Sequence, residues 1–293
     1  MRLGLGTVQF GQDYGISNRH GRPAVDEVAA ILRVAADGGV DLLDTAHAYG
    51  DAEEILGELA VETAPFRVVT KTPAARVSAI GDAEVGRVRG GFSDSLARLQ
   101  RTSLFGLLLH RAADLALPGG ERLAETLVRL REEGKVAKVG VSVYSPADLD
   151  RVIRVFRPDL VQLPFSVLDQ RFARSGHLAE LRRQGVEVHL RSVFLQGVLL
   201  MDPARIPDAL QALRPSLAAW RRHLDGEGVS PLAGALAVAR RADADICLVG
   251  VNSSGEMGEI LGAWEKAQQV VAEAGPFACD DERWIVPANW PAR

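Results

Sequence analysis

Short apolar runs alternate with amphipathic stretches along almost the whole chain. Each run is continuously apolar and is bounded by charged or turn-forming residues. This pattern is typical of strands that are buried on both faces of a parallel sheet. The runs that we predict to be strands span residues 2–8, 40–45, 67–72, 104–110, 138–143, 160–165, 187–192 and 245–251.

The stretches between the runs have the periodicity of helices. In residues 25–39, apolar side chains recur every three or four positions, so they share one face of a helix. Gly39 and Gly134 each follow the last apolar position of such a stretch, where we expect them to cap the helix. Further helices are predicted over residues 121–134, 146–156 and 231–242.

The count of strand–helix units predicts an α/β fold, a (β/α)8 TIM barrel, in one domain that spans residues 1–293. An open doubly wound sheet is the competing architecture. It would place GxGxxG after the first strand, but residues 4–9 read GLGTVQ and lack the third glycine. Residues 196–228 and the segment after Gly275 interrupt the rhythm and are candidates for functional loops.

Composition narrows the function classes. The chain is 47% hydrophobic and 25% charged, which is typical of a globular protein, and its net charge of −4 gives no reason to expect a nucleic acid partner. No apolar run reaches the ~20 residues that a membrane span needs. Cys247 and Cys279 have no metal-ligand spacing, and we predict no metal site. We expect a cytoplasmic protein that acts on a small molecule, as a monomer or a small homo-oligomer.

Four chemically distinct polar residues follow successive strands. Asp44 ends the second strand and Tyr49 lies just beyond it, while Lys71 and His110 end the third and fourth. The active sites of barrels lie at the carboxyl ends of their strands, so these residues are expected on one rim. Each has a simpler interpretation: a turn-capping Asp, a solvated Lys, a buried hydrogen-bonded His and a Tyr that packs in a loop. All four would then have gathered on adjacent strands by accident.

Carbonyl reduction is the chemistry that uses this set. The substrate oxygen must receive a proton as hydride reaches the carbon, and a tyrosine with a pKa of about 10 is a poor acid unless a nearby cation stabilises its phenolate. We expect Lys71 to supply that charge and Asp44 to hold Lys71 in place. We expect His110 to donate a hydrogen bond to the substrate's carbonyl oxygen.

The segment DTAHAYGDAE (residues 44–53) resembles the DTAxxYGxxE signature of the aldo-keto reductase superfamily, and Asp44, Tyr49, Lys71 and His110 resemble its catalytic tetrad. The resemblance runs over nearly the whole chain. The segments LGTVQFG and RSVFLQG are similar to a bacterial branch associated with sugar or polysaccharide clusters. The resemblance implies an NAD(P)H-dependent reduction of an aldehyde or ketone, with Tyr49 as proton donor and a sugar-like compound as one candidate substrate.

The same resemblance implies a cofactor site with two departures from the family pattern. Val143 stands where the family has Asn, and Arg191 stands where it has an aromatic residue that stacks on nicotinamide. A guanidinium plane can also stack on a ring, and its charge would favour the reduced, neutral nicotinamide. The implied cofactor-binding residues are Thr7, Ser142, Gln162, Arg191, Ser192, Leu195, Gln196, Gly197, Gly250, Asn252, Ser253 and Glu259.

The loop after the last strand bears on cofactor choice. Ser253 and Glu256 match a capping box, while free N–H groups at such a helix start also bind phosphate. Family members that select NADPH usually carry Arg or Lys here, but none occurs between Asn252 and Ile260. The resemblance makes NADP(H) the expected cofactor and leaves NAD(H) open. Arg240 or Arg191 is the alternative source of a cation for the 2′-phosphate.

Two further residues are candidates for the substrate pocket, and two further functions compete. His47 lies beside Tyr49, and Trp284 lies in a tail that would fold over the barrel mouth. The alternative interpretations are that His47 lies in a solvated loop and that Trp284 anchors the tail on an outer helix. The competing functions are a sugar or alcohol dehydrogenase that works in the oxidative direction and a nicotinamide-binding regulatory protein with little turnover.

Overall fold

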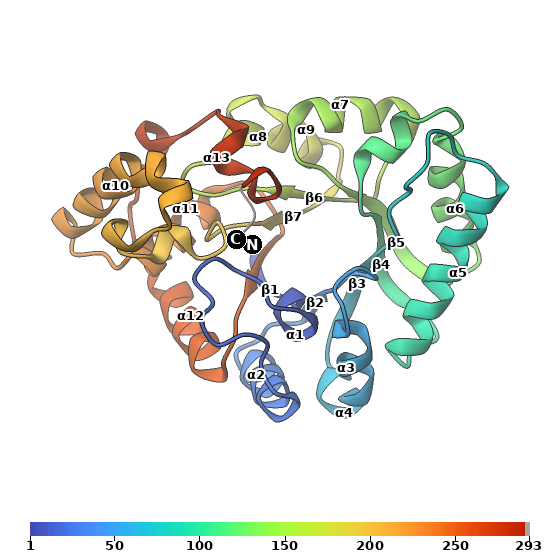
Figure 1. The fold of residues 1–293 in the computed structure, drawn as a ribbon, viewed down its shortest axis with the longest axis horizontal. Coiled ribbons are helices and arrows are strands. Elements are labelled where there is room, and N and C mark those ends of the chain that lie inside the picture. Colours follow the sequence, from blue (N-terminus) through green and yellow to red (C-terminus); the bar gives the residue numbers. More distant parts are fainter. Residues whose placement is uncertain (291–293) are drawn as a thin grey trace.

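Eight parallel strands close into a barrel in the computed structural model, which describes residues 1–290 (Figure 1). The strands follow one another around the ring in chain order, and β1 pairs with β8 to close it. The (β/α)8 prediction is therefore confirmed. The predicted domain extends to residue 293, and its last three residues lie outside the described part. The strands are β1 (Arg2–Gly6), β2 (Leu42–Asp44), β3 (Arg67–Lys71), β4 (Leu104–Leu109), β5 (Val136–Ser142), β6 (Leu160–Pro164), β7 (Glu187–Arg191) and β8 (Ile246–Gly250).

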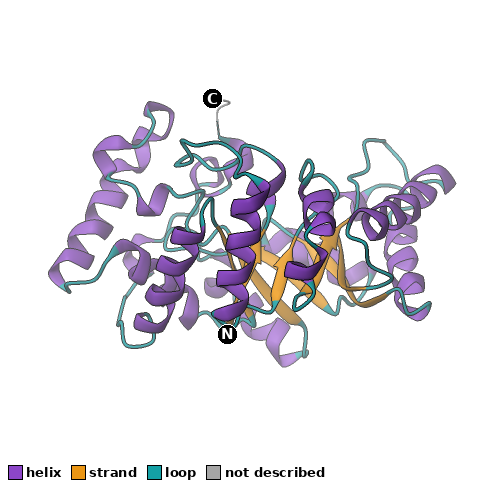
Figure 2. Cartoon of the chain, turned by 90° about the horizontal axis from the view of Figure 1, so that it is seen from below, coloured by secondary structure: helices purple, strands orange, loops and turns teal. Residues whose placement is uncertain are grey.

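Helices surround the barrel and cover the outer faces of the strands (Figures 1 and 2). They bury their apolar stripes against the sheet, as the 3.6-residue periodicity predicted. Among the described residues, no helix is both long and apolar enough to cross a bilayer. The outer helices are α2 (Val25–Asp37), α3 (Ala52–Glu58), α4 (Ala60–Thr63), α5 (Asp82–Arg98), α6 (Glu121–Glu132), α7 (Pro146–Val155), α9 (His177–Arg183), α11 (Pro231–Arg241) and α12 (Ser254–Lys266).

Glycine ends two of these helices, as predicted. Gly39 and Gly134 have φ values of +78° and +72°, in the left-handed region where a helix cannot continue. Hydrogen bonding of α2 and α6 therefore stops two residues earlier, at Asp37 and Glu132. The predicted boundaries were too long for this reason.

The two segments that interrupt the rhythm contain helices of their own. Residues 196–228 include α10, whose Leu217, Trp220 and Leu224 are buried at helical spacing. These apolar positions are the sequence signal that the loop interpretation overlooked. The short elements in the connections and the tail are α1 (Val8–Gly11), η1 (Ala112–Ala116), α8 (Arg171–Arg174), η2 (Val198–Leu200), η3 (Pro203–Arg205), η4 (Asp208–Leu213), α10 (Arg214–Gly226), η5 (Gly275–Phe277), α13 (Glu282–Ile285) and η6 (Pro287–Asn289).

A separate apolar cluster fills the inside of the barrel. Its members come from five strands and are nearly or fully buried. Because side chains alternate faces along a strand, the residue two positions after each member also points inward, one layer nearer the carboxyl end. The cluster consists of Leu42, Val69, Leu108, Leu160, Ile246 and Leu248.

The connection after β2 is fixed by contact between two glycine backbones. Gly50 has φ +55°, and a Cβ atom built on it would lie 2.2 Å from the carbonyl oxygen of Gly11. A Cβ atom on Gly11 would lie 1.7 Å from the carbonyl oxygen of Tyr49. Helix α1 thus packs directly on the Tyr49–Gly50 backbone, and neither glycine has room for a side chain.

We therefore expect Gly50→Ala to reduce the free energy of unfolding by clearly more than the ~1–2 kcal/mol that left-handed strain alone costs. Gly228→Ala is the matched control, because Gly228 has φ +65° but nothing within 4 Å of its Cβ position. Denaturant unfolding of both variants measures the difference. Equal losses in the two variants would show that the contact with Gly11 contributes nothing.

Candidate active site

The polar residues predicted at the strand ends point into the mouth of the barrel. Asp44, Lys71, His110 and Gln162 each lie two positions after a member of the interior apolar cluster. The alternation of side chains therefore directs all four to the same interior layer. The structure brings together the four residues of the predicted tetrad, with Gln162 beside them.

A buried ion pair joins two of these residues. Lys71 Nζ donates to Asp44 Oδ2 at 2.7 Å and to the carbonyl oxygen of Thr45 at 2.8 Å. Gln162 Nε2 donates to the other carboxylate oxygen of Asp44 at 2.7 Å. The Lys71 and Asp44 side chains are only 1% and 7% exposed, so water does not screen their attraction. Asp44 thus has both oxygens bonded, and the ammonium group is held in one place.

Tyr49 lies over this pair and beside His110. Lys71 Nζ is 4.9 Å from the centroid of the Tyr49 ring. The rings of Tyr49 and His110 meet edge to face, with centroids 5.9 Å apart and an interplanar angle of 82°. The glycine contact described above sets the position of the Tyr49 backbone. An acid, an amine, a phenol and an imidazole therefore share one small volume.

Burial dominates the protonation states in this volume. It raises the pKa of Tyr49 far above the usual 10, the Asp44 carboxylate raises it further, and the Arg191 guanidinium opposes both. The net effect in the free protein is a raised pKa for this phenol, and stabilisation of its phenolate by Lys71 stays a prediction. Burial also lowers the pKa of Lys71, against the effect of Asp44. Tyr49 consequently keeps its proton at neutral pH, as a proton donor must.

His110 is uncharged at neutral pH. Burial, and after it the positive charge of Lys71, lower the pKa of its imidazole from 6.5 to about 4. A neutral imidazole can still donate one N–H hydrogen bond to a carbonyl oxygen.

A single cavity extends from the tetrad to the loop after β8. Its volume is about 540 Å³, and most of the residues predicted to bind a cofactor line it. Those that do are Thr7, Ser142, Gln162, Arg191, Ser192, Gln196, Gly197, Gly250, Asn252 and Glu259.

Four predicted residues lie outside the cavity wall. Leu195 is fully buried, and Ser253 uses its hydroxyl to accept from Glu256 N at 3.1 Å, which confirms its predicted role as helix cap. His47 turns toward α5, where Arg98 Nη2 lies 2.9 Å from its Nδ1. Trp284 stays in the tail, where its carbonyl oxygen accepts from Trp290 Nε1. Neither His47 nor Trp284 lines the cavity, so the structure gives no support to a substrate role for either.

The loop after β7 has an unusual backbone. Ser192, Leu195 and Gln196 have φ values of +61°, +48° and +54°, and Gly197 follows at +87°. Non-glycine residues seldom adopt this conformation, and its clustering is a mark of functional loops. Loops with left-handed turns can present backbone N–H groups to an anion such as pyrophosphate.

Tyr144 and the loop after β1 were missed by the sequence interpretation, which considered only the last polar residue of each strand. Tyr144 lines the cavity, and the Arg191 guanidinium lies 4.1 Å above its ring while donating to the carbonyl oxygen of Val143 at 3.0 Å. Gln12 and Tyr14 line the cavity from the loop after β1. Their position after the first strand was the available signal, since every loop at this end of a barrel borders the site.

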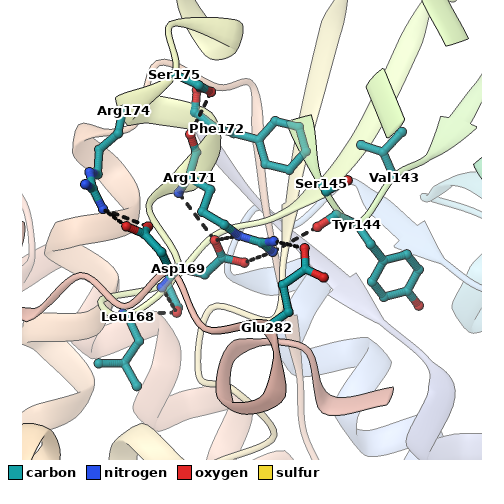
Figure 3. A network of polar contacts seen from close by, with 12 residues as sticks. Val143, Tyr144, Ser145, Leu168, Asp169, Arg171, Phe172, Arg174, Ser175 and Glu282 are labelled. Atoms are coloured by element: carbon teal, nitrogen blue, oxygen red, sulfur yellow. Dashed lines mark hydrogen bonds and ion pairs between the residues drawn. The ribbon is translucent and has the colours of Figure 1, made fainter. Parts of the chain in front are cut away.

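A surface network holds the Tyr144 backbone in place (Figure 3). Arg171 donates to both carboxylate oxygens of Asp169, at 2.9 Å each, and to Glu282 in the tail at 2.5 Å. Its Nη2 also donates to the carbonyl oxygen of Tyr144 at 2.9 Å. The tail therefore supports the cavity wall from behind instead of closing its mouth.

We expect the His110 imidazole to remain neutral down to about pH 4 in the folded protein. NMR of the imidazole nitrogens, assigned by comparison with His110→Gln, would measure this directly. Because the unfolded chain takes up this proton near the usual pKa of 6.5, the shift also destabilises the fold as the pH falls from 6.5 towards 4. A titration near 6.5 in the folded protein would contradict the burial argument.

Comparison with known proteins places the chain in a family. The model of the Aldo/keto reductase family matches residues 2–274. The chain is 30% identical over 184 residues to the aldo-keto reductase YhdN of Bacillus subtilis and 34% identical over 137 residues to a 6-dehydroglucose reductase of Novosphingobium aromaticivorans. These matches cover 59% and 43% of this chain and 53% and 44% of the relatives, so the chain spans about half the length of the curated relatives it matches.

Solved structures share the fold. An aldo-keto reductase of Bacillus halodurans in its holo form superposes with a TM-score of 0.73 at 18% identity, over 96% of this chain and 95% of that one. A glycerol dehydrogenase of Gluconobacter oxydans gives 0.71 at 20% identity, over 98% and 92%. The family match covers more than nine-tenths of the sequence and agrees with the barrel fold. The chain belongs to the aldo/keto reductase family.

Proposed function

We propose that the chain reduces an aldehyde or ketone to an alcohol with NAD(P)H, and that Tyr49 donates the proton. The observation that carries the proposal is the buried Lys71–Asp44 pair beneath the Tyr49 ring. A buried ion pair is costly to keep in a protein core, and here it faces a cavity next to a protonated phenol. This arrangement suits the stabilisation of a negative charge that forms on a substrate oxygen.

The chain's own residues account for the proton and the charge. NAD(P)H, held by the residues that line the cavity, would supply the hydride that reduces the carbonyl carbon. Tyr49 gives its phenolic proton to the carbonyl oxygen, and the Lys71 ammonium stabilises the phenolate that remains. His110, neutral at working pH, orients the carbonyl oxygen through an N–H donor. Solvent then returns a proton to Tyr49.

Unpaired acceptors along the cavity fit a nicotinamide dinucleotide. The side-chain oxygens of Gln9, Gln162 and Asn252 are buried and have no hydrogen-bond partner within the described residues. Buried acceptors are rarely left unpaired, so a bound molecule with N–H or O–H groups is expected to meet them. A carboxamide and ribose hydroxyls supply such donors. The left-handed loop at residues 192–197 suits the pyrophosphate between them.

A polyhydroxylated, sugar-like carbonyl compound is the substrate class that we favour. The similarity to a 6-dehydroglucose reductase supports it, as do the amide of Gln12 and the hydroxyl of Ser17 on the cavity wall. The proposal retains the cytoplasmic location and the small-molecule partner expected from the sequence.

Arg191 favours the reductive direction over the dehydrogenase alternative. Its guanidinium lines the reacting end of the cavity, close enough to lower the pKa values of both Lys71 and His110. NAD(P)+ carries a positive charge on its nicotinamide ring, whereas NAD(P)H does not. A fixed cation beside the ring therefore binds the reduced form in preference.

We expect Tyr49→Phe to lower kcat by about 10²–10⁴-fold, the usual contribution of a general acid. Its affinity for NAD(P)H, measured by fluorescence titration, should stay within a few-fold of wild type. Lys71→Met should lower kcat similarly, with circular dichroism to check that the barrel persists without the ion pair. Full activity in both variants would exclude Tyr49 as proton donor. Cofactor binding without turnover above the Tyr49→Phe level, over a panel of carbonyl compounds, would favour the regulatory alternative.

We expect Arg191→Gln to lower the ratio of the Kd for NAD(P)+ to the Kd for NAD(P)H by about tenfold, because it removes a like-charge repulsion. Titration of each cofactor form, without substrate, measures both constants. Arg154→Gln is the matched control, since Arg154 is exposed on α7 and outside the cavity wall. An unchanged ratio in Arg191→Gln would remove the support for the reductive direction.

A further inference from the structure

The end of the cavity beside α12 is acidic. Asn252, Glu256 and Glu259 line it there, and both glutamates are exposed to the cavity and solvent. A barrel of this type commonly binds a phosphate with the loops after strands 7 and 8 and the start of a nearby helix. Two carboxylates at that place repel a further phosphate group on the ligand, such as the 2′-phosphate that distinguishes NADP(H) from NAD(H).

Carboxylates and a hydroxyl already occupy donors at the start of α12. The N–H of Asn252 donates to Glu256 Oε2 at 2.7 Å, and the N–H of Ser254 donates to Glu27 Oε1 at 2.5 Å. The N–H of Glu256 donates to Ser253 Oγ at 3.1 Å. These groups are the ones that would otherwise attract an anion to a helix start. Their positive potential is already offset by Glu256 and Glu27.

The cations of the chain lie elsewhere. Of the described residues that line the cavity, Lys71 and Arg191 are the cationic ones, and both belong to the reacting end. Lys71 is paired with Asp44, and Arg191 lies over Tyr144. Arg240, the other candidate from the sequence, is outside the cavity wall, with its guanidinium 4.2 Å above the ring of Trp264. Neither candidate is placed to meet a 2′-phosphate.

From this charge distribution we infer that the chain selects NAD(H) over NADP(H), which reverses the expectation drawn from the sequence. The inference rests on the proposed function, because it assigns the adenosine half of that cofactor to the α12 end. A 2′-phosphate carries about −1.5 to −2 charges at neutral pH and would face Glu256 and Glu259 without a counter-cation. A ribose 2′-hydroxyl is neutral and can donate to a carboxylate, as in other NAD-selective sites.

The first experiment compares ADP-ribose with 2′-phospho-ADP-ribose by calorimetry on the full chain. These ligands lack nicotinamide, so any difference arises at the adenosine end. We expect ADP-ribose to bind at least about tenfold more tightly, and the gap to narrow as salt is added. NADH and NADPH, titrated by fluorescence, should differ in the same sense. Equal or tighter binding of the 2′-phosphorylated ligands would overturn the inference.

The second experiment tests the two carboxylates. Glu256→Gln combined with Glu259→Gln should lower the ratio of the Kd for 2′-phospho-ADP-ribose to the Kd for ADP-ribose by about fivefold or more. Glu265→Gln combined with Glu273→Gln is the matched control, because it removes the same two charges from exposed positions outside the cavity. An equal fall of the ratio in the control would show that net charge, and not the cavity wall, sets the selectivity.

The outcomes separate this inference from the proposed function. Failure of all four ligands to bind would overturn both. Preferential binding of NADH without turnover of any carbonyl compound would support the selectivity and contradict the reductase proposal. Turnover that depends on Tyr49 but prefers NADPH would support the reductase and overturn the selectivity.

Discussion

The ion pair between Lys71 and Asp44 is the interaction on which the rest of the site depends. Removing two charges from water costs several kcal/mol each, and their attraction recovers this only when the geometry is good and the remaining polar atoms are bonded. Here Gln162 and the Thr45 carbonyl complete the bonding. The three elements involved are neighbouring or opposing strands of a closed barrel, which holds them rigidly. The charges of the pair also shift the pKa values of Tyr49 and His110, so a displaced ion pair would change the protonation of both residues.

The core and the site are built by the same alternation of side chains. Leu42, Val69, Leu108 and Leu160 fill the inside of the barrel, and the next inward position on each of their strands carries a polar residue of the site. The apolar layer beneath excludes water and lowers the local dielectric, which strengthens the electrostatic interactions above it. On each of these strands, one inward-facing residue stabilises the core, and the next one towards the carboxyl end belongs to the site.

Much of this could be predicted from the sequence, because the signals are local. Continuous apolar runs identified the eight strands, and the last polar residue of each identified the tetrad. Side-chain direction was not predictable: His47 is two residues from Tyr49, yet it turns to Arg98 on another helix. Effects of distant residues were also hidden. Glu27 reaches the start of α12 from α2, and burial raises the pKa of the Tyr49 phenol. These features depend on the closed fold, which no short window of sequence contains.

Closure of the ring between β1 and β8 has a consequence for the order of folding. Arg2 through Gly6 pair with Ile246 through Gly250, so the last seam joins segments more than two hundred residues apart in the chain. The cavity spans that seam, with Thr7 on one side and Glu259 on the other. Contacts between such distant segments form late, because the loop that they close is long. During synthesis, most of the strands and helices can form before the cavity exists, and we expect the ability to bind a ligand to appear only with the final closing of the ring.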